Sequence, residues 1–145
     1  MADTPDGLAR RWFKEVWDDG DESAIDRLMH PQALVHGLGS TPIRGPEQFK
    51  PFFRVFHRAL GDLKIDIART VVEGDTCAVH CRVVARHIGP DLGGPATGSP
   101  VDFWGMTIVR VENGKIVEGW NSFDFLTMYQ QIGWVANPVL PGMPR

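Results

Sequence analysis

Basic runs, long apolar runs and a secretory signal are all missing from this sequence, and each absence narrows the range of functions. The net charge is −3 and no long basic stretch occurs, so neither nucleic acid nor an anionic membrane surface is an expected partner. No run of about 18 apolar residues occurs, so no membrane-spanning helix is expected. Residues 1–17 lack the apolar core of a secretory signal, which favours a cytoplasmic protein.

Motifs for metal, nucleotide and covalent chemistry are also missing. The sequence has no His-x-x-x-His pair and no cluster of carboxylates, so no metal site is predicted. No Ser or Cys lies in a nucleophile elbow, and the stretch GLGS at 37–40 is too short for a phosphate-binding loop. We therefore predict a protein that works without a metal and without a cofactor.

Cysteine is scarce, and the two that are present do not predict a disulfide. Cys77 and Cys81 lie four residues apart in one predicted strand, which separates them by about 13 Å. That separation is too long for a disulfide bond. We expect two reduced thiols in the core of a cytosolic protein.

Aromatic residues are plentiful, and the chain is long enough to bury them. The 145 residues include eight Phe and five Trp, which fits one globular domain with an aromatic interior. We assign residues 1–133 to this domain. Residues 134–145 contain three Pro, so we expect a tail there and no helix.

Helical patterns dominate the first part of the chain. A helix is expected from the Thr4-Pro5-Asp6 start, and a short second helix should end at His30-Pro31. A third helix should begin near Pro46, and its apolar stripe consists of Phe49, Phe52, Phe53, Phe56 and Leu60.

Strand patterns dominate the rest. The Gly- and Pro-rich residues 88–99 must form a loop, and Asn113-Gly114 is a strong hairpin signal. Asp124 should cap a last helix. The fold class is therefore α+β, a curved antiparallel sheet with N-terminal helices that enclose a cone-shaped pocket. The expected strands cover 33–39, 63–73, 76–87, 100–112 and 115–123.

Five stretches in the same order resemble SnoaL-like polyketide cyclases and the related ester cyclases. They are RWFKEVWDDGD, VHGLGS with RGPEQF, RHIGPDLGGPATG, VENGKIVEGW and GWNSFDFLTMYQQIG. Together they span roughly residues 8–133. The resemblance implies a nuclear-transport-factor-like cone, usually dimeric, and a cofactor-free intramolecular aldol reaction that closes a polyketide ring.

Two positions depart from the pattern that the resemblance implies. The best-known members have a proton-shuttling Asp at the position of Asn121 and a His at the position of Thr107. An amide and a hydroxyl are poor bases near neutral pH. We expect Asn121 to hold a substrate oxygen instead, while His36 or His87 moves the proton.

The candidate site combines these residues with an aromatic wall. His87 continues the apolar face of its strand, and His36 should lie near the pocket mouth, whereas His57 and His80 are expected at the surface. Pairing across the Asn113-Gly114 turn should place Thr107 opposite position 120 and beside Asn121. The catalytic candidates are His36, His87, Asn121 and Asp124, and the substrate-binding candidates are Phe13, Trp17, Phe53, Phe56, Trp104 and Thr107.

Three functions fit this pattern. The first is a cofactor-independent cyclase, isomerase or lyase that acts on a flat apolar or aromatic carbonyl compound. The second is a binding protein that kept the pocket and lost the acid/base pair. The third is a hydrolase or hydratase with a held water. A homodimer is also expected, because the outward strand positions are unusually apolar: Trp104, Met106, Ile108 and Trp120.

Overall fold

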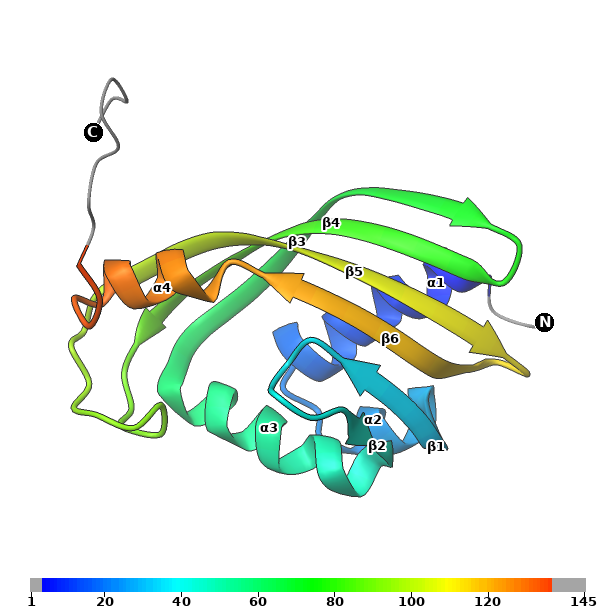
Figure 1. Ribbon diagram of the computed structural model, residues 1–145, viewed down its shortest axis with the longest axis horizontal. Coiled ribbons are helices and arrows are strands. Elements are labelled where there is room, and N and C mark those ends of the chain that lie inside the picture. Colours follow the sequence, from blue (N-terminus) through cyan, green and yellow to red (C-terminus); the bar gives the residue numbers. More distant parts are fainter. Residues whose placement is uncertain (1–3, 137–145) are drawn as a thin grey trace.

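The first helix begins where the sequence predicts it. The computed structural model describes residues 4–136 (Figure 1). The hydroxyl of Thr4 accepts a hydrogen bond from the N–H of Gly7 at 3.2 Å, which caps α1 (Pro5–Arg11). The chain then continues without a break into a π-helical segment, η1 (Trp12–Asp18), which the sequence did not predict.

The π-helical segment η1 places aromatic side chains on one side. Its N–H groups bond five residues back, as the N–H of Asp19 does to the carbonyl of Lys14 at 2.8 Å. In an α-helix, residues five apart point about 140° away from each other. The wider π turn brings Trp12 and Trp17 toward the same side, where both are buried together with Phe13.

The second helix ends earlier, and the first strand starts earlier, than the sequence suggests. The second helix, α2 (Ser23–Leu28), runs directly into β1 (Met29–His36), whereas the expected strand covered 33–39. Pro31 does not exclude the strand, because it lies where the register of β1 against its neighbour shifts. The sequence also missed β2 (Ile43–Arg44), a two-residue strand that pairs with β1.

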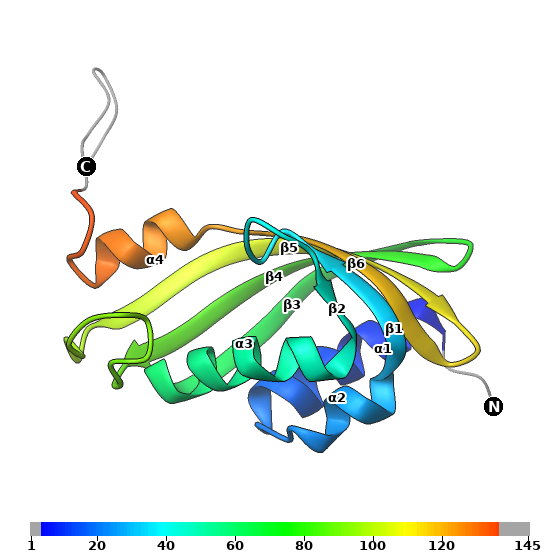
Figure 2. The same cartoon turned by 60° about the horizontal axis from the view of Figure 1, so that its bottom comes forward.

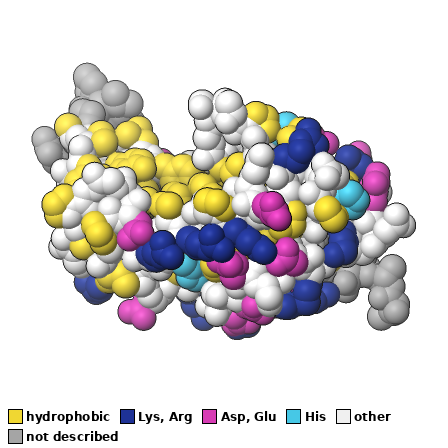
Figure 3. All heavy atoms as spheres, turned by 90° about the horizontal axis from the view of Figure 1, so that it is seen from below, with side chains coloured by type: hydrophobic (Ala, Val, Ile, Leu, Met, Phe, Trp, Pro, Cys, Tyr) yellow, Lys and Arg dark blue, Asp and Glu magenta, His cyan; other side chains and the backbone are white. Residues whose placement is uncertain are grey.

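The third helix, α3 (Gly45–Ala59), is amphipathic as expected. A row of Lys and Arg side chains follows its outer side (Figure 3). Two of these pair with acids of the preceding helix region: Lys50 with Asp26 at 2.8 Å and Arg54 with Glu22 at 2.7 Å. These surface ion pairs add little to stability, and α3 packs on the N-terminal helices mainly through its inward-facing phenylalanines.

The remaining elements form the body of the sheet. The sheet has six strands in the order β2-β1-β6-β5-β4-β3, and only the β1–β6 pair is parallel. It curves over α3 and the N-terminal helices (Figures 1 and 2). The predicted α+β class is confirmed. The bounds are β3 (Leu60–Glu73), β4 (Thr76–His87), β5 (Pro100–Glu112), β6 (Lys115–Phe123) and α4 (Phe125–Gln131).

Strand β4 shows the alternation that the sequence predicts. Cys77, Val79, Cys81 and Val83 are buried, whereas Arg82 on the other face is exposed. Both cysteines are free thiols, as expected, and burial raises the pKa of Cys81 to about 12. A thiol with such a pKa stays protonated near neutral pH, so Cys81 is a packing residue.

Candidate active site

A hollow lies between the concave face of the sheet and the helices. It encloses about 760 Å³ of empty space, part of which is open to solvent. Seen from the α3 side, hydrophobic side chains gather in a hollow above the basic row (Figure 3). The lining is almost entirely apolar and consists of Trp12, Phe13, Trp17, Met29, Val35, Leu38, Phe49, Phe52, Phe56, Leu60, Leu63, Ile65, Val83, Phe103, Thr107, Val109, Ile116, Gly119, Asn121, Phe123 and Phe125.

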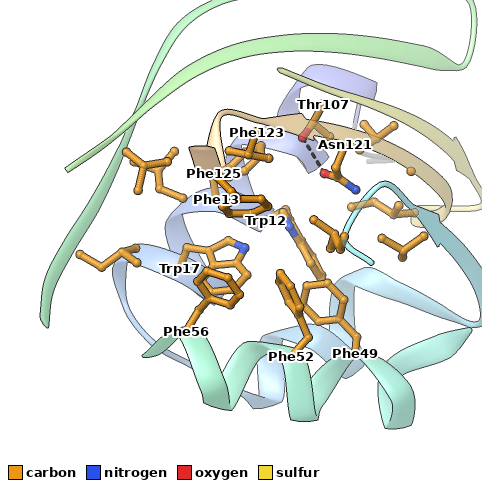
Figure 4. A pocket seen from close by; sticks show the side chains of 18 of the residues that line it. Trp12, Phe13, Trp17, Phe49, Phe52, Phe56, Thr107, Asn121, Phe123 and Phe125 are labelled. Carbon is orange, nitrogen blue, oxygen red and sulfur yellow. Dashed lines mark hydrogen bonds between the residues drawn. The ribbon is translucent and has the colours of Figure 1, made fainter. Parts of the chain in front are cut away.

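The helix-side wall is built by η1 and α3. The ring of Trp12 meets Phe49 edge-on at 5.1 Å between centroids, and Trp17 meets Phe52 edge-on at 6.2 Å. Edge-to-face contacts of this kind fix ring orientation as well as position. The predicted wall residues Phe13, Trp17 and Phe56 therefore lie where the sequence placed them (Figure 4).

Two predicted wall residues lie outside the pocket. Phe53 is buried, but it packs behind the wall against Trp17 and His57. Trp104 points to the outer face of the sheet, where it is 43% exposed and packs against His80. The prediction that Phe53 and Trp104 line the pocket is wrong, because Phe53 packs into the core behind Trp17 and the alternation of β5 turns Trp104 to the outer face.

Among the described lining residues, Asn121 and Thr107 form the one polar spot on the sheet-side wall. The hydroxyl of Thr107 donates a hydrogen bond to Oδ1 of Asn121 at 2.8 Å (Figure 4). The two residues pair directly across β5 and β6, so the expected partner position 120 is off by one. The difference arises from a register shift beside Val117, which adds one residue to β6 between its pairs with β5.

The Asn121 amide has a defined orientation. Its Nδ2 donates to the carbonyl oxygen of His36 at 3.0 Å, and a carbonyl can only accept. The opposite orientation would place two oxygens together, so Oδ1 must face the Thr107 hydroxyl. One N–H of Nδ2 and lone pairs on Oδ1 and the Thr107 oxygen remain for a ligand.

Gly37 lets the bend after β1 approach Asn121 closely. Its φ is +87°, and a Cβ at this position would lie 1.9 Å from the backbone oxygen of Asn121. Only glycine fits such a site without displacing the chain. The approach brings the carbonyl of His36 to the amide that it orients.

The imidazole of His36 does not face the pocket, so that prediction is wrong. Val35 points into the pocket, and the alternation of β1 therefore sends His36 to the outer face. There its Nε2 lies 2.8 Å from a carboxylate oxygen of Glu118, and its ring stacks on Trp120. The hydrogen bond from His36 lowers the pKa of Glu118. Only the backbone carbonyl of His36 contributes to the site.

The imidazole of His87 is on the predicted inner face but beyond the pocket. It is fully buried, and its Nδ1 accepts a hydrogen bond from the N–H of Thr97 at 3.2 Å. Trp134 meets the ring edge-on at 5.2 Å. His87 does not line the pocket. The predicted face of β4 was right, but His87 is the last residue of the strand and lies beyond the cavity, beside the loop that follows.

Asp124 has the capping role that its sequence context favours. Its carboxylate accepts hydrogen bonds from the N–H of Thr127 at 3.0 Å and from the Thr127 hydroxyl at 2.6 Å. The carboxylate therefore satisfies the first turn of α4 and does not line the pocket. The structure does not support Asp124 as a pocket residue.

His57 lies behind the pocket, although the sequence suggested a surface position. Its ring stacks on Trp17 at 5.5 Å with an angle of 7° between the planes, and its Nε2 is buried without a partner in residues 4–136. Burial lowers its pKa below the ordinary histidine value. A neutral His57 therefore supports Trp17 from behind.

Of the residues that the structure describes, no ionisable side chain lines the pocket. Among residues 4–136, no three His, Cys, Asp or Glu side chains gather closely enough to hold a metal ion. None of the helices in this range is long and apolar enough to cross a membrane. The chemistry available to a ligand is therefore an amide, a hydroxyl and two indole N–H groups in an aromatic enclosure.

Sequence reasoning missed several residues of the wall. Trp12 was not among the predicted wall residues, and the π turn of η1 brings it to the same side as Trp17. Phe123 and Phe125 lie where β6 meets α4, and both line the pocket. Phe123 crosses Gly105, whose missing side chain leaves room for the ring. Gly105 was the available signal, since glycine inside a strand often marks close packing.

Comparison with known proteins identifies the relatives of this chain. It is 26% identical over 132 residues to aklanonic acid methyl ester cyclase DnrD of Streptomyces peucetius, covering 87% of this chain and 88% of DnrD. A candidate SnoaL-like polyketide cyclase from Jannaschia sp. CCS1 superposes with a TM-score of 0.80 at 27% identity, over 90% of this chain and 91% of that one.

A more distant structure shows how general the fold is. A protein with a ketosteroid-isomerase-like fold from Catenulispora acidiphila DSM 44928 superposes with a TM-score of 0.76 at 15% identity, over 95% of this chain and all of that one. The described residues thus have a ketosteroid-isomerase-like α+β fold. The family model for SnoaL-like polyketide cyclases matches residues 7–132, and this chain belongs to that family.

Proposed function

We propose that the pocket binds a flat, apolar carbonyl compound of the polyketide type and promotes its ring closure or isomerisation without a cofactor. The observation that carries this proposal is the Asn121 amide, oriented by two protein hydrogen bonds within an otherwise apolar wall. The relative DnrD is an aklanonic acid methyl ester cyclase, which supports ring closure as the reaction class here.

The amide would act on the substrate oxygen. Its remaining N–H donates to a carbonyl oxygen as that oxygen gains negative charge on enolate formation. A donor fixed in advance in a dry site stabilises such charge strongly, and loss of one such donor typically costs about 10²–10³-fold in rate. Thr107 keeps the amide in place, since its own donor is already used on Oδ1.

The enclosure would supply the geometry. In a ring closure, a C–H proton leaves the nucleophilic carbon, a C–C bond forms, and a proton ends on the attacked carbonyl oxygen, so no atoms are gained or lost. Holding a flexible chain folded against rigid aromatic walls removes much of the entropy cost of this step. Because none of the described lining residues is ionisable, water at the mouth is the proton carrier in this proposal.

A second function rests on the same lining. A pocket without an ionisable side chain also suits a protein that binds a carbonyl compound and releases it unchanged. The two functions differ in the fate of the ligand. They share the hydrogen bond to Asn121.

Recovered ligand and a matched pair of variants test these functions. Organic extraction of the purified protein, followed by NMR and mass spectrometry, identifies a bound compound, which is then returned to fresh protein. A cyclised isomer of equal mass supports the enzyme, and unchanged recovery supports the binding protein. Asn121→Leu should slow turnover about 10²–10³-fold. A wild-type rate in folded Asn121→Leu would refute the role of the amide.

A further inference from the structure

Two hydrogen-bond donors on the helix-side wall have no acceptor among residues 4–136. Trp12 and Trp17 both line the pocket and are each 8% exposed. Figure 4 shows their indole nitrogens on the ring edges that face the space between the aromatic side chains. Within residues 4–136, neither indole N–H bonds to another residue, and the only fully buried side-chain nitrogens without a partner belong to His57 and His87.

The orientation of both indoles is fixed from behind. Trp12 meets Phe49 edge-on at 5.1 Å, and Trp17 has His57 stacked on it at 5.5 Å. The π-helical turn holds the two tryptophans on one side. A mostly buried indole N–H usually finds a hydrogen-bond partner, so two such donors held toward one cavity are suited to a ligand acceptor.

The opposite wall provides a third donor. The free N–H of Asn121 lies on β6, on the sheet side of the same cavity. The pocket is therefore rich in donors at both walls, and its described lining holds no cation to balance an anionic ligand. An uncharged molecule with acceptors at two ends satisfies these groups best.

We infer that Trp12 and Trp17 form a second oxygen-binding subsite, so that the pocket selects a flat neutral compound with carbonyl oxygens at opposite ends. This inference rests on the proposed function, in which Asn121 binds one of those oxygens. The indoles bind the other and set the orientation of the ligand between the two walls. They are specificity-determining residues, and the reacting oxygen remains at Asn121.

Three probes of similar shape test the inference: naphthalene, 1-tetralone and 2,3-dimethyl-1,4-naphthoquinone, which have zero, one and two carbonyl oxygens. Dissociation constants are measured by calorimetry for wild type, Trp12→Phe/Trp17→Phe and Asn121→Leu. A substitution also changes the shape of the pocket, and naphthalene, which has no carbonyl oxygen, measures that effect alone. The quantity compared is therefore the ratio of the dissociation constant of naphthalene to that of the quinone. We expect the double variant to lower this ratio about 2- to 12-fold for each hydrogen bond lost.

Indole NMR signals give a second readout that does not depend on affinity. The chain has five tryptophans, and Trp104, Trp120 and Trp134 lie outside the pocket lining, so their indole signals serve as internal controls. The Nε1–H signals of Trp12 and Trp17, assigned from the single Phe variants, should move downfield with the quinone and not with naphthalene. Equal shifts with both probes would overturn the inference.

The variants separate this inference from the proposed function. If the ratio is unchanged in the double variant but falls in Asn121→Leu, the indole subsite is refuted and the role of Asn121 stands. If the ratio falls only in the double variant, the indole subsite stands and the role of Asn121 is refuted. A wild-type protein that shows no preference for carbonyl probes contradicts both.

Discussion

The Asn121 side chain depends on the backbone that approaches it. Gly37 adopts φ +87°, and any side chain there would collide with the backbone oxygen of Asn121. Gly37→Ala should therefore lower the free energy of unfolding by about 1–3 kcal/mol and weaken quinone binding, because the His36 carbonyl moves off the amide. Chemical denaturation and calorimetry measure the two effects.

A nearby glycine provides the control for this substitution. Gly39 is not among the glycines with a positive φ, and a Cβ added there would meet no atom within 4 Å. Gly39→Ala should leave both stability and binding within experimental error. If Gly37→Ala also leaves the stability and the quinone binding unchanged, the close approach of Gly37 does not orient the Asn121 amide.

His57, which lies behind the pocket, should make the free energy of unfolding depend on pH. Burial lowers its pKa, so the unfolded chain binds a proton more readily than the folded one. Its contribution to stability is present above the ordinary pKa of 6.5 and is lost as the pH falls through the lower folded value. His57→Phe keeps an aromatic ring against Trp17 and should flatten the fall in unfolding free energy below pH 6.5. Denaturant titrations from pH 7.5 to 5 would contradict this if both proteins gave the same slope.

At the scale of elements, one carboxylate ties η1 to the sheet. The N–H of Ile65 on β3 donates to Oδ1 of Asp18 at 2.7 Å. Asp18→Ala leaves that partly buried N–H without its acceptor and should cost about 1–3 kcal/mol of unfolding free energy. The neighbouring Asp19 pairs with Lys14 at the surface, so Asp19→Ala is the matched control and should cost less than about 1 kcal/mol. Equal losses in the two variants would show that the tie is unimportant.

The sequence predicts the long helices and strands better than the segments that connect them. Hydrophobic periodicity locates α3 and β4, because one face of each is continuously buried. It cannot distinguish a π turn from an α turn in η1, since both bury the same residue types. Two-residue β2 is too short to leave a pattern.

For the same reason, the sequence predicts which residues pair better than it predicts which side chains reach the pocket. Asn121 and Thr107 were placed together because a hairpin turn fixes their pairing to within one residue, and the shift beside Val117 supplies the rest. The parity of His87 was predicted correctly, but parity does not say how far along a strand the cavity extends. His36 was misplaced because its parity is opposite to that of Val35, which lines the pocket.

At the scale of the whole molecule, the outer sheet face is unusually apolar. Trp104, Met106, Ile108 and Trp120 are 43%, 58%, 42% and 39% exposed, and the Arg82–Asp102 ion pair lies on the same face. We predict that two copies of the chain associate through this face, since a patch of this kind is rarely left open to water.

Light scattering tests the predicted association. The chain mass is 16.1 kDa, so the expected result is twice that mass at micromolar concentration. Ile108→Glu should give the monomer mass with an unchanged circular dichroism spectrum, because it places a charge in the interface while remaining at the surface of the subunit. A wild-type protein that stays at the monomer mass would refute the dimer.

The most direct test of the central claim is the side-chain amide signal of Asn121 during binding. It is assigned from the signal pair missing in Asn121→Leu, and 2,3-dimethyl-1,4-naphthoquinone and naphthalene are then added in turn. The Nδ2 proton bonded to the His36 carbonyl should stay in place, while the other proton moves downfield only with the quinone. Two protons that do not move, or that move equally with both compounds, would contradict a carbonyl-binding amide in this pocket.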